Sequence, residues 1–299
     1  MRQKYSEDIE DELLAKALVL ETGDTRVAFV TCDLIAMPQA VADAVKARIS
    51  ERCGIPGSHV MVNGTHTHSG AGICDLLGVS VDQAYVDWVP GRIADAVELA
   101  VCRLRPARIG FAQATEDRIV FNRRWHLKDG TVRMNPGRDS EELETCTGPV
   151  DPDLPIIYVE GEDGSPISVV ANYALHYIGV EAPNAISADY FGHFYRQIRG
   201  ILGDTCVPLL WNGAAGQINN VDFSGERVWE ERGHAHAAKM AAVLAGHVLT
   251  EIQLMRMQDD IDLDARLETF EFPRKTITPE DLALAEKILA APEGTYDDY

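Results

Sequence analysis

Short apolar runs and longer amphipathic stretches alternate along the chain. The first two runs, Leu13–Leu20 and Arg26–Asp33, have the length of strands and flank a polar turn at Glu21–Thr25, which predicts a β-hairpin. Gln39–Cys53 then carries apolar residues at helical spacing, and His59–Asn63 is another short apolar run. A strand, a helix and a strand in this order predict a βαβ unit, and therefore parallel pairing in the sheet.

The rest of the chain continues the mixed pattern. Asp82–Leu104 has an apolar stripe of helical period that contains Pro90, which predicts a kinked helix or two helices. Asn135–Asp153 is acidic and loop-like, as is typical of a lid or an inserted loop. We expect further strands at Arg108–Ala114, Arg118–Asn122, Trp125–Lys128, Thr131–Met134, Ile156–Glu160, Ile167–Leu175, Cys206–Trp211 and Leu263–Phe272, and helices at Asp189–Leu202, Val228–Met255 and Pro279–Ala290. The expected fold class is α/β: a mixed β-sheet core with a βαβ unit and added hairpins, flanked by helices.

The composition is that of a folded protein with an acidic exterior. Of 299 residues, 46% are apolar and 25% are charged, and 27 Lys and Arg stand against 47 Asp and Glu, which gives a net charge of −20. Because phosphate backbones are bound through Lys and Arg, we expect no nucleic-acid partner. An anionic membrane surface is disfavoured for the same reason. We interpret the negative charge as a well-solvated surface.

Cysteines and termini give further expectations. Six cysteines are scattered without a CxxC pair, so we expect buried free thiols rather than disulfides or metal ligands. No apolar run approaches the roughly 20 residues of a membrane helix, so no transmembrane segment is expected. The first residues carry acids where a signal peptide would have its apolar core, which favours a cytoplasmic location.

The segment Asn63–Gly72, NGTHTHSGAG, is the most informative in the chain. It follows a predicted strand and carries His66 and His68 two residues apart, so that in extended geometry both rings point to one side. Two converging imidazoles suit a borderline metal such as zinc, although surface or hydrogen-bonded histidines share this spacing. His176 ends the apolar strand Ser168–Leu175 and is either a further corner of that site or a core histidine bonded to backbone.

Other candidate residues lie at the ends of predicted elements. Asp33 and Asp189 are alternatives for a third ligand; Asp33 could instead orient a ligand's second nitrogen, and Asp189 could cap its helix. Arg123 and Arg124 are surface charges unless an anion or a developing oxyanion lies beside them. Leu210–Val221, LWNGAAGQINNV, is a loop rich in amide donors. The chain has no GxSxG, which argues against a serine hydrolase, and no GxGxxG after its first strand, which argues against a dinucleotide site.

The chain resembles the neutral/alkaline non-lysosomal ceramidase family. The resemblance is carried by NGTHTHSGAG, FNRR, NYALHYIG, SADYFG and WNGAAGQINN, which follow in the family's order and cover most of Leu13–Leu249. It implies a zinc-dependent amidase with a mixed α/β catalytic domain that cleaves the N-acyl bond of ceramide. It also implies a single Zn²⁺ held by His66 and His176, with His68 and Arg123 as the pair that contacts the scissile carbonyl or the product carboxylate.

The sequence departs from the family pattern at one loop and at both ends. Asn219 stands where the family has the serine of a G-D-x-S-P-N loop, which implies that Asn219 lies at the reaction centre. The Glu and Tyr that complete the family's zinc shell have no match before Tyr299, and the family's glycine-rich opening strand has no match in MRQKYSEDIEDEL. We therefore expect residues 1–299 to form a single ceramidase-like catalytic domain without these elements, either a fragment or a divergent member.

The expected function is that of a zinc-dependent amidohydrolase. Its substrate would be an N-acyl amide, either ceramide or a related lipid or small molecule, attacked by metal-activated water. This route does not require the missing serine, because His68 and Arg123 would hold the oxyanion. Two alternatives stay open. One is a metal hydrolase of small soluble amides or esters, and the other is an inactive or truncated domain that acts as a binding module.

Overall fold

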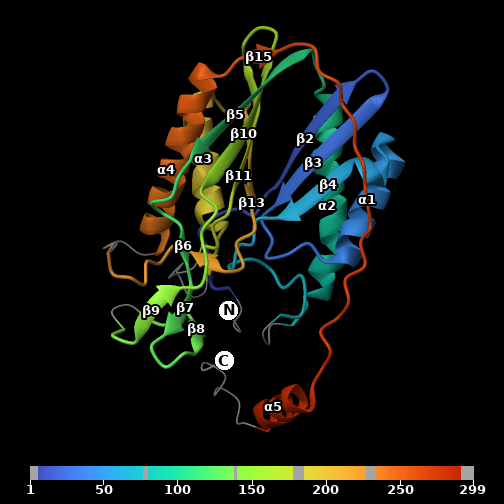
Figure 1. Ribbon diagram of the computed structural model, residues 1–299. Coiled ribbons are helices and arrows are strands. Elements are labelled where there is room, and N and C mark those ends of the chain that lie inside the picture. The colour runs from blue at the N-terminus through green and yellow to red at the C-terminus, as the bar shows by residue number, and fades with distance from the viewer. Residues whose placement is uncertain (1–5, 77–79, 138–139, 178–184, 227–232, 291–299) are drawn as a thin grey trace. The chain divides into compact units, whose positions relative to one another are not determined.

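Two β-sheets face each other in the computed structural model of the protein, and each carries a pair of helices on its outer face (Figure 1). The structure describes residues 6–76, 80–137, 140–177, 185–226 and 233–290. The layers run in the order helices, sheet, sheet, helices, with α3 and α4 on one side and α1 and α2 on the other. The predicted mixed α/β fold class is confirmed.

The first sheet has three strands in the order β2-β3-β4. β2 (Ala15–Thr22) and β3 (Thr25–Cys32) form the predicted antiparallel hairpin. β4 (Val60–Gly64) lies parallel to β3 and is reached through α1 (Gln39–Cys53), so the predicted βαβ unit is confirmed. α2 (Gln83–Cys102) packs beside α1 and continues through Pro90 as one helix, not two.

The second sheet has five strands in the order β13-β11-β10-β5-β15. Its strands are β5 (Ala107–Thr115), β10 (Asp153–Gly161), β11 (Pro166–Tyr173), β13 (Val207–Asn212) and β15 (Met257–Gln258). β10 and β11 form the predicted hairpin, and β11 runs parallel to β13. The connection between β11 and β13 contains α3 (Asp189–Leu202), which packs against α4 (Gly233–Leu254).

Short strands complete the first of two compact units, Met1–Arg266. They are β1 (Asp8–Ile9), β6 (Phe121–Asn122), β7 (Arg124–Leu127), β8 (Val132–Met134), β9 (Leu143–Cys146), β12 (Ala185–Ile186) and β14 (Ile218–Asn219), and a short 3-10 helix, η1 (Gly57–His59), precedes β4. β7 and β8 are the predicted hairpin across the Asp-Gly turn. In Figure 1 the small sheet of β7, β8 and β9 lies below the two large sheets.

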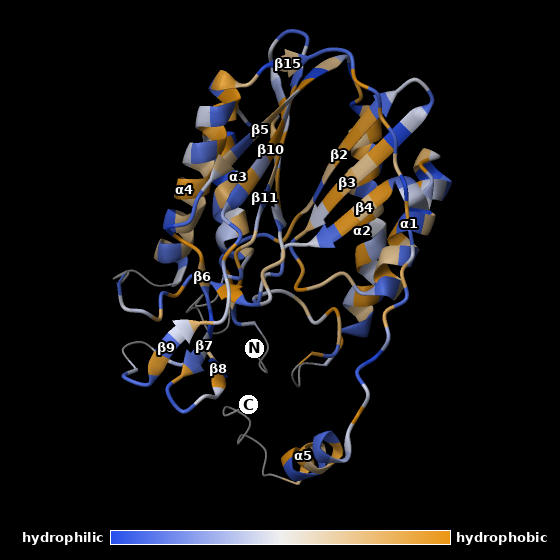
Figure 2. Cartoon of the chain, in the orientation of Figure 1, coloured by the Kyte–Doolittle hydropathy of each residue, from blue (hydrophilic) through white to orange (hydrophobic). Residues whose placement is uncertain are grey.

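Alternate residues of the strands enter different apolar layers. In β3, Val30 packs against α1 and α2, whereas Phe29 enters the layer between the sheets. In β11, Val169 packs against α3 and α4, whereas Val170 enters the middle layer. There the ring centroid of Phe29 lies 5.4 Å from that of Trp211, which joins the two sheets. Figure 2 shows the strands of the first sheet as largely apolar, which follows because they are buried on both faces.

Three expectations differ from the structure. The loop expected at Asn135–Asp153 contains β9, which pairs with β7, so part of it belongs to the small sheet. Leu263–Phe272 alternates in polarity but forms no strand, and Phe270 and Phe272 are 70% and 85% exposed. The helix expected from Val228 is described from Gly233, and its first five expected positions lie outside the described residues.

Leu267–Tyr299 is a second compact unit with one described helix, α5 (Pro279–Leu289). The Thr278 side chain accepts a hydrogen bond from the backbone of Asp281, whose carboxylate accepts one in return from the Thr278 backbone. This capping box, with Pro279 in the first turn, confirms the predicted start of the helix.

The cysteines and the helices bear on two further expectations. All six cysteines are free, but only Cys32, Cys53 and Cys206 are buried, whereas Cys102 and Cys146 are exposed. The expectation of buried thiols is therefore correct for only some of them. None of the described helices combines the length and apolarity that crossing a lipid bilayer requires.

Candidate metal centre

His66 is held by backbone contacts just beyond the end of β4. Its N–H donates to the Leu34 carbonyl at 2.9 Å, and its Nδ1 lies 2.6 Å from the Ile35 carbonyl oxygen. Because a carbonyl can only accept, Nδ1 carries the ring proton, which leaves the lone pair on Nε2. Gly64 permits this close approach, since a Cβ there would lie 2.8 Å from the Leu34 oxygen.

Two further histidines meet His66 from different parts of the chain. His68 lies two residues further along the same loop, and His176 follows β11, which belongs to the second sheet. The Nε2 atoms of His68 and His176 are 2.9 Å apart. Ring centroids are separated by 4.8 Å for His66 and His68, 4.7 Å for His66 and His176, and 4.9 Å for His68 and His176. The structure therefore brings together all three histidines, whereas the sequence paired His66 with His68 and left the place of His176 open.

The route by which His66 and His68 converge differs from the expectation. Extended backbone is expected at both histidines, but β4 ends at Gly64 and His66 has a φ of 73°. A left-handed backbone turn therefore directs the two rings to one point, at a cost of order 1 kcal/mol or more for a residue that carries a Cβ. Strain of this kind persists where the surrounding structure fixes the conformation, as the contacts of His66 do.

The electrostatic environment favours neutral imidazoles. Burial, followed by the repulsion that would arise if His66 were protonated as well, lowers the pKa of His68 to about 4. Burial, followed by the positive charge of Arg123, lowers the pKa of His176 to about 3. Both rings are therefore neutral at neutral pH, which is the form that binds a metal.

The three histidines form a donor set suited to a metal ion. One ligand nitrogen from each of His66, His68 and His176 can be chosen so that all lie within 4.8 Å of one another. Imidazole nitrogen is a preferred donor for zinc, and three protein ligands with one open position are typical of a catalytic zinc site. Within the described residues, no carboxylate belongs to this group.

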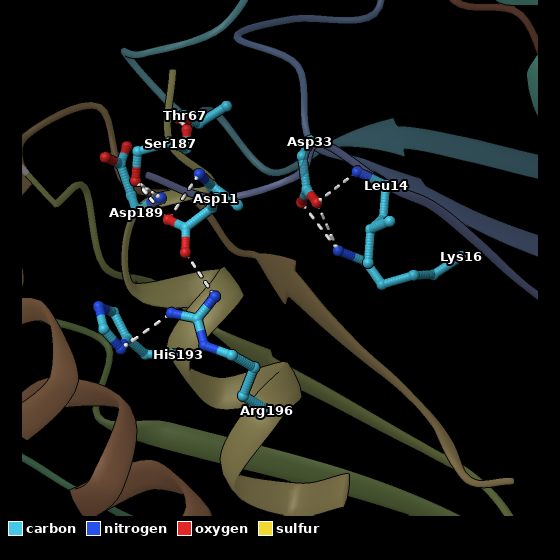
Figure 3. Close-up of polar contacts among 10 residues, drawn as sticks. Asp11, Leu14, Lys16, Asp33, Thr67, Ser187, Asp189, His193 and Arg196 are labelled. Atoms are coloured by element: carbon cyan, nitrogen blue, oxygen red, sulfur yellow. Dashed lines mark hydrogen bonds and ion pairs between the residues drawn. The ribbon is translucent and has the colours of Figure 1, made fainter. Parts of the chain in front are cut away.

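Asp33 and Asp189 have other partners (Figure 3). Asp33 accepts hydrogen bonds from Lys16 Nζ at 2.8 and 2.9 Å and from the Leu14 N–H at 2.9 Å. Its carboxylate is thus engaged in a buried ion pair and lies outside the histidine group. Asp189 Oδ2 accepts the backbone N–H of His68 at 3.1 Å, so it contacts the loop that carries this histidine. Neither observation supports the hypothesis that an aspartate is the third ligand.

Arg123 lies where the short strands β6 and β14 meet. Its backbone N–H donates to the Gln217 carbonyl at 2.8 Å, and its Nε and Nη2 donate to the Gly216 carbonyl at 3.2 and 2.8 Å. Burial lowers the pKa of Arg123, but an arginine retains its charge at neutral pH. Because this charge contributes to the lowered pKa of both His68 and His176, Arg123 is an electrostatic neighbour of the histidine group.

Asn219 is fully buried in the loop that holds Arg123. Its Nδ2 donates to Asn135 Oδ1 at 3.1 Å, and its Oδ1 accepts the Val221 N–H at 2.8 Å. These contacts fix the loop after β13 to the segment that follows β8. They do not connect Asn219 with the histidines, and its place at the reaction centre stays a prediction.

The residues that hold the histidine loop through hydrogen bonds were not identified from the sequence. Thr67 Oγ1 donates to the Ser187 carbonyl at 2.6 Å and accepts the Ser69 N–H at 3.2 Å. Asp11, near the N-terminus, accepts the Ser187 hydroxyl at 2.6 Å. No local signal in the sequence pairs Asp11 with a residue 176 positions away, because both lie in irregular segments next to two-residue strands.

Solved structures with a similar fold include neutral ceramidases. The neutral ceramidase of Pseudomonas aeruginosa matches with a TM-score of 0.62 and 19% identity, over 82% of this chain and 39% of that one. A structure described as a ceramidase complexed with C2 matches with a TM-score of 0.66 and 20% identity, over 83% of this chain and 39% of that one. The chain thus spans well under half the length of these proteins, and at this identity they establish a shared fold. A model of the N-terminal part of the neutral/alkaline non-lysosomal ceramidases matches residues 1–196, which contain all three histidines, and the chain belongs to that family.

Proposed function

We propose that the chain carries a zinc-dependent hydrolytic centre that cleaves N-acyl amides, with His66, His68 and His176 as the metal ligands. The observation that carries the proposal is the convergence of three histidine nitrogens within 4.8 Å of one another, with the His66 proton fixed on Nδ1 by Ile35. Membership of the ceramidase family supports hydrolysis of an amide as the reaction. We propose zinc as the ion because imidazole nitrogen is one of its preferred donors.

The donor set includes His68, which the resemblance places at the scissile carbonyl instead. Among the described residues, His66, His68 and His176 together supply the three protein ligands that a catalytic zinc site generally uses. His68 Nε2 lies 2.9 Å from His176 Nε2, somewhat closer than the roughly 3.4 Å that separates two nitrogens on one tetrahedral zinc ion. We therefore assign His68 to the metal rather than to the substrate carbonyl.

When bound, zinc would lower the pKa of a coordinated water and polarise the carbonyl of the substrate. The protein contributes orientation and charge. The Ile35 carbonyl holds the ring of His66, and Asp189 holds the backbone of His68. Arg123 is fixed by the Gly216 carbonyl through Nε and Nη2, so its remaining edge can donate to the oxygen on which negative charge develops. Asn219 would act indirectly, by holding the loop from which Gly216 contacts Arg123.

The substrate class proposed is a lipid or small-molecule N-acyl amide, with ceramide as the family's example. A smaller soluble amide or ester is the alternative substrate. The rival proposal is an inactive binding module. The observation that favours it is Asn219, which stands where the family pattern has a serine and whose amide nitrogen and amide oxygen are both hydrogen-bonded within the protein.

One experiment separates these possibilities. The full chain, loaded with zinc, is assayed with long-chain and short-chain N-acyl amides of one fluorogenic amine, before and after a chelator and after zinc is restored. We expect zinc-dependent release of the amine that His66→Ala abolishes and that His126→Ala, a change at an exposed histidine on β7, leaves intact. Stoichiometric zinc without turnover on either amide would favour the binding module, and a folded chain that takes up no zinc would contradict the proposal.

A further inference from the structure

Asp11 is a buried carboxylate with an extensive set of partners (Figure 3). Its Oδ2 accepts the Ser187 hydroxyl at 2.6 Å and the Ala188 N–H at 3.2 Å, and its Oδ1 pairs with Arg196 of α3. Burial alone would raise its pKa, but the hydrogen bonds from Ser187 and Arg196 outweigh that effect, so the pKa is lowered and the group is charged. A buried charge of this kind fixes the geometry around it, because each displaced partner would leave it unpaired.

A continuous series of hydrogen bonds leads from Asp11 to the histidine loop. The Ser187 hydroxyl that donates to Asp11 also accepts the N–H of Asp189 at 3.0 Å. Asp189 Oδ2 in turn accepts the N–H of His68 at 3.1 Å. Two side chains and one backbone amide therefore separate the Asp11 carboxylate from the backbone of a proposed metal ligand.

Backbone contacts run beside this series. Asp8 and Ile9 pair with Ala185 and Ile186, and the Ser187 N–H donates to the Ser69 carbonyl at 3.0 Å. The N-terminal segment, residues 8–14, also joins the other side of the loop, because the N–H of Asp33 donates to the Leu14 carbonyl at 3.0 Å. This segment therefore connects the end of β3 with the start of α3, the two places between which the histidine loop is held.

Backbone strain falls at the same point. Asp189 has a φ of 51°, in the left-handed region that favours glycine, although it is the first residue of α3. Holding a residue with a Cβ there costs of order 1 kcal/mol, and such a conformation persists where its surroundings fix it. The Ser187 hydroxyl and the His68 amide are the contacts that this conformation serves.

We infer that Asp11 is a positioning residue for the histidine group, acting through Ser187 and Asp189 to set the place of His68. The inference rests on the proposed metal site, and it concerns what holds a ligand rather than which residues are ligands. A purely structural role is the alternative, since the carboxylate also accepts the N–H of Ala188, the residue just before α3, and could only stabilise the start of that helix.

The substitutions are chosen to separate positioning from capping. Asp11→Asn removes the charge, whereas Ser187→Ala cuts the link to Asp189 and leaves Asp11 with Arg196 and the Ala188 amide. Asp189→Gly removes the acceptor for His68 while fitting the positive φ, and Asp189→Asn retains an acceptor and tolerates that φ. The matched control is Glu116→Gln, which changes another buried carboxylate whose partners are Arg118 and His247.

Each folded variant is measured in two ways. Zinc affinity is determined by competition with a chromophoric chelator, and the exchange rate of the His68 amide is measured by NMR on metal-free protein. We expect Asp11→Asn, Ser187→Ala and Asp189→Gly to bind zinc about 10–100-fold more weakly, the range typical of lost support for a ligand. The same variants should exchange the His68 amide about tenfold faster. Asp189→Asn should match the wild type in both measurements, and Glu116→Gln should match it in zinc affinity.

The two measurements distinguish the two proposals. If Ser187→Ala retains wild-type zinc affinity and wild-type exchange at His68, the Asp11 inference is wrong, and Asp11 only caps α3. If the wild type binds no zinc, the proposed function fails, while faster exchange of the His68 amide in Ser187→Ala still supports positioning. Should Asp11→Asn not fold, Ser187→Ala decides the question, because it leaves the charged pair intact.

Discussion

The Nε2 atoms of His68 and His176 lie 2.9 Å apart, although 108 positions separate the two residues. His68 follows the last strand of the first sheet, and His176 follows β11 of the second sheet. Because the sheets pack face to face, the contact exists only when both halves of the sandwich are in place. The candidate metal centre is thus a product of sheet packing, and a bound metal would tie the two halves together.

His68 should contribute to metal binding as strongly as its neighbours. If all three rings are ligands, His68→Ala, His66→Ala and His176→Ala each lower zinc affinity by at least about 100-fold, more than the loss of supporting contacts does. Equilibrium competition against a chelator gives the affinity, with His126→Ala as the control at an exposed histidine. Wild-type affinity together with lost turnover in His68→Ala would instead assign this residue to the substrate carbonyl.

The buried ion pair of Lys16 and Asp33 should matter for stability and not for zinc. Asp33→Asn leaves the Lys16 ammonium, which is 5% exposed, without its counter-charge, so we expect the free energy of unfolding to fall by about 3–5 kcal/mol. The double variant Lys16→Met/Asp33→Leu should recover most of that loss, because no unpaired charge remains. Urea unfolding measures both effects. A zinc affinity that falls in folded Asp33→Asn would return Asp33 to the ligand set.

Two buried threonines in the described chain should respond in opposite ways to the same change. Thr31 Oγ1 is buried without a hydrogen-bond partner among the described residues, so Thr31→Val should leave stability unchanged or raise it by up to about 1 kcal/mol. Thr67 Oγ1 bonds with Ser187 and Ser69, so Thr67→Val should lower stability by about 1–2 kcal/mol. Urea unfolding of the metal-free proteins measures the stability of both variants. Equal effects of the two changes would contradict the difference in hydrogen bonding between Thr31 and Thr67.

Glu116 should stabilise the fold down to acidic pH. Burial opposes its ionisation, but hydrogen bonds from Arg118 and His247 outweigh this and lower its pKa from 4.5 to about 2. Because the pKa is lower in the folded chain, the stabilisation is complete above pH 4.5 and is lost as the pH falls towards 2. Glu116→Gln should therefore cost about 1–3 kcal/mol at neutral pH and progressively less in acid. A difference from wild type that does not change with pH, measured by urea unfolding, would count against this account.

The hydrophobic pattern was sufficient to predict most helices and strands, but not how the sheets and helices pack into layers. It predicted the first hairpin, the βαβ unit and the helices because each carries its own period. It did not predict two facing sheets, since neighbours such as Leu18 and Val19 are both buried, on opposite faces of β2, and such a strand has no polar side. At Leu263–Phe272 the alternation predicted a strand that does not form, because periodicity alone carries no information on strand pairing.

The candidate site could be predicted in part. The spacing of His66 and His68 and the place of His176 after a strand identified the three residues, but the role of His68 depends on the left-handed turn at His66. That turn is set by contacts with Leu34 and Ile35, which lie more than thirty positions away. Long-range contacts between irregular segments leave no periodic signal in the sequence. The contact of Asp11 with Ser187 could not be predicted for the same reason.

X-ray absorption at the zinc edge tests the central claim most directly. The measurement is made on the full chain loaded with one equivalent of zinc and freed of excess metal. We expect a first shell of nitrogen and oxygen at about 2.0–2.1 Å with outer-shell scattering from about three imidazole rings, which His68→Ala reduces to about two. A wild-type spectrum with two imidazoles that His68→Ala leaves unchanged, or failure to retain zinc, would contradict a three-histidine centre.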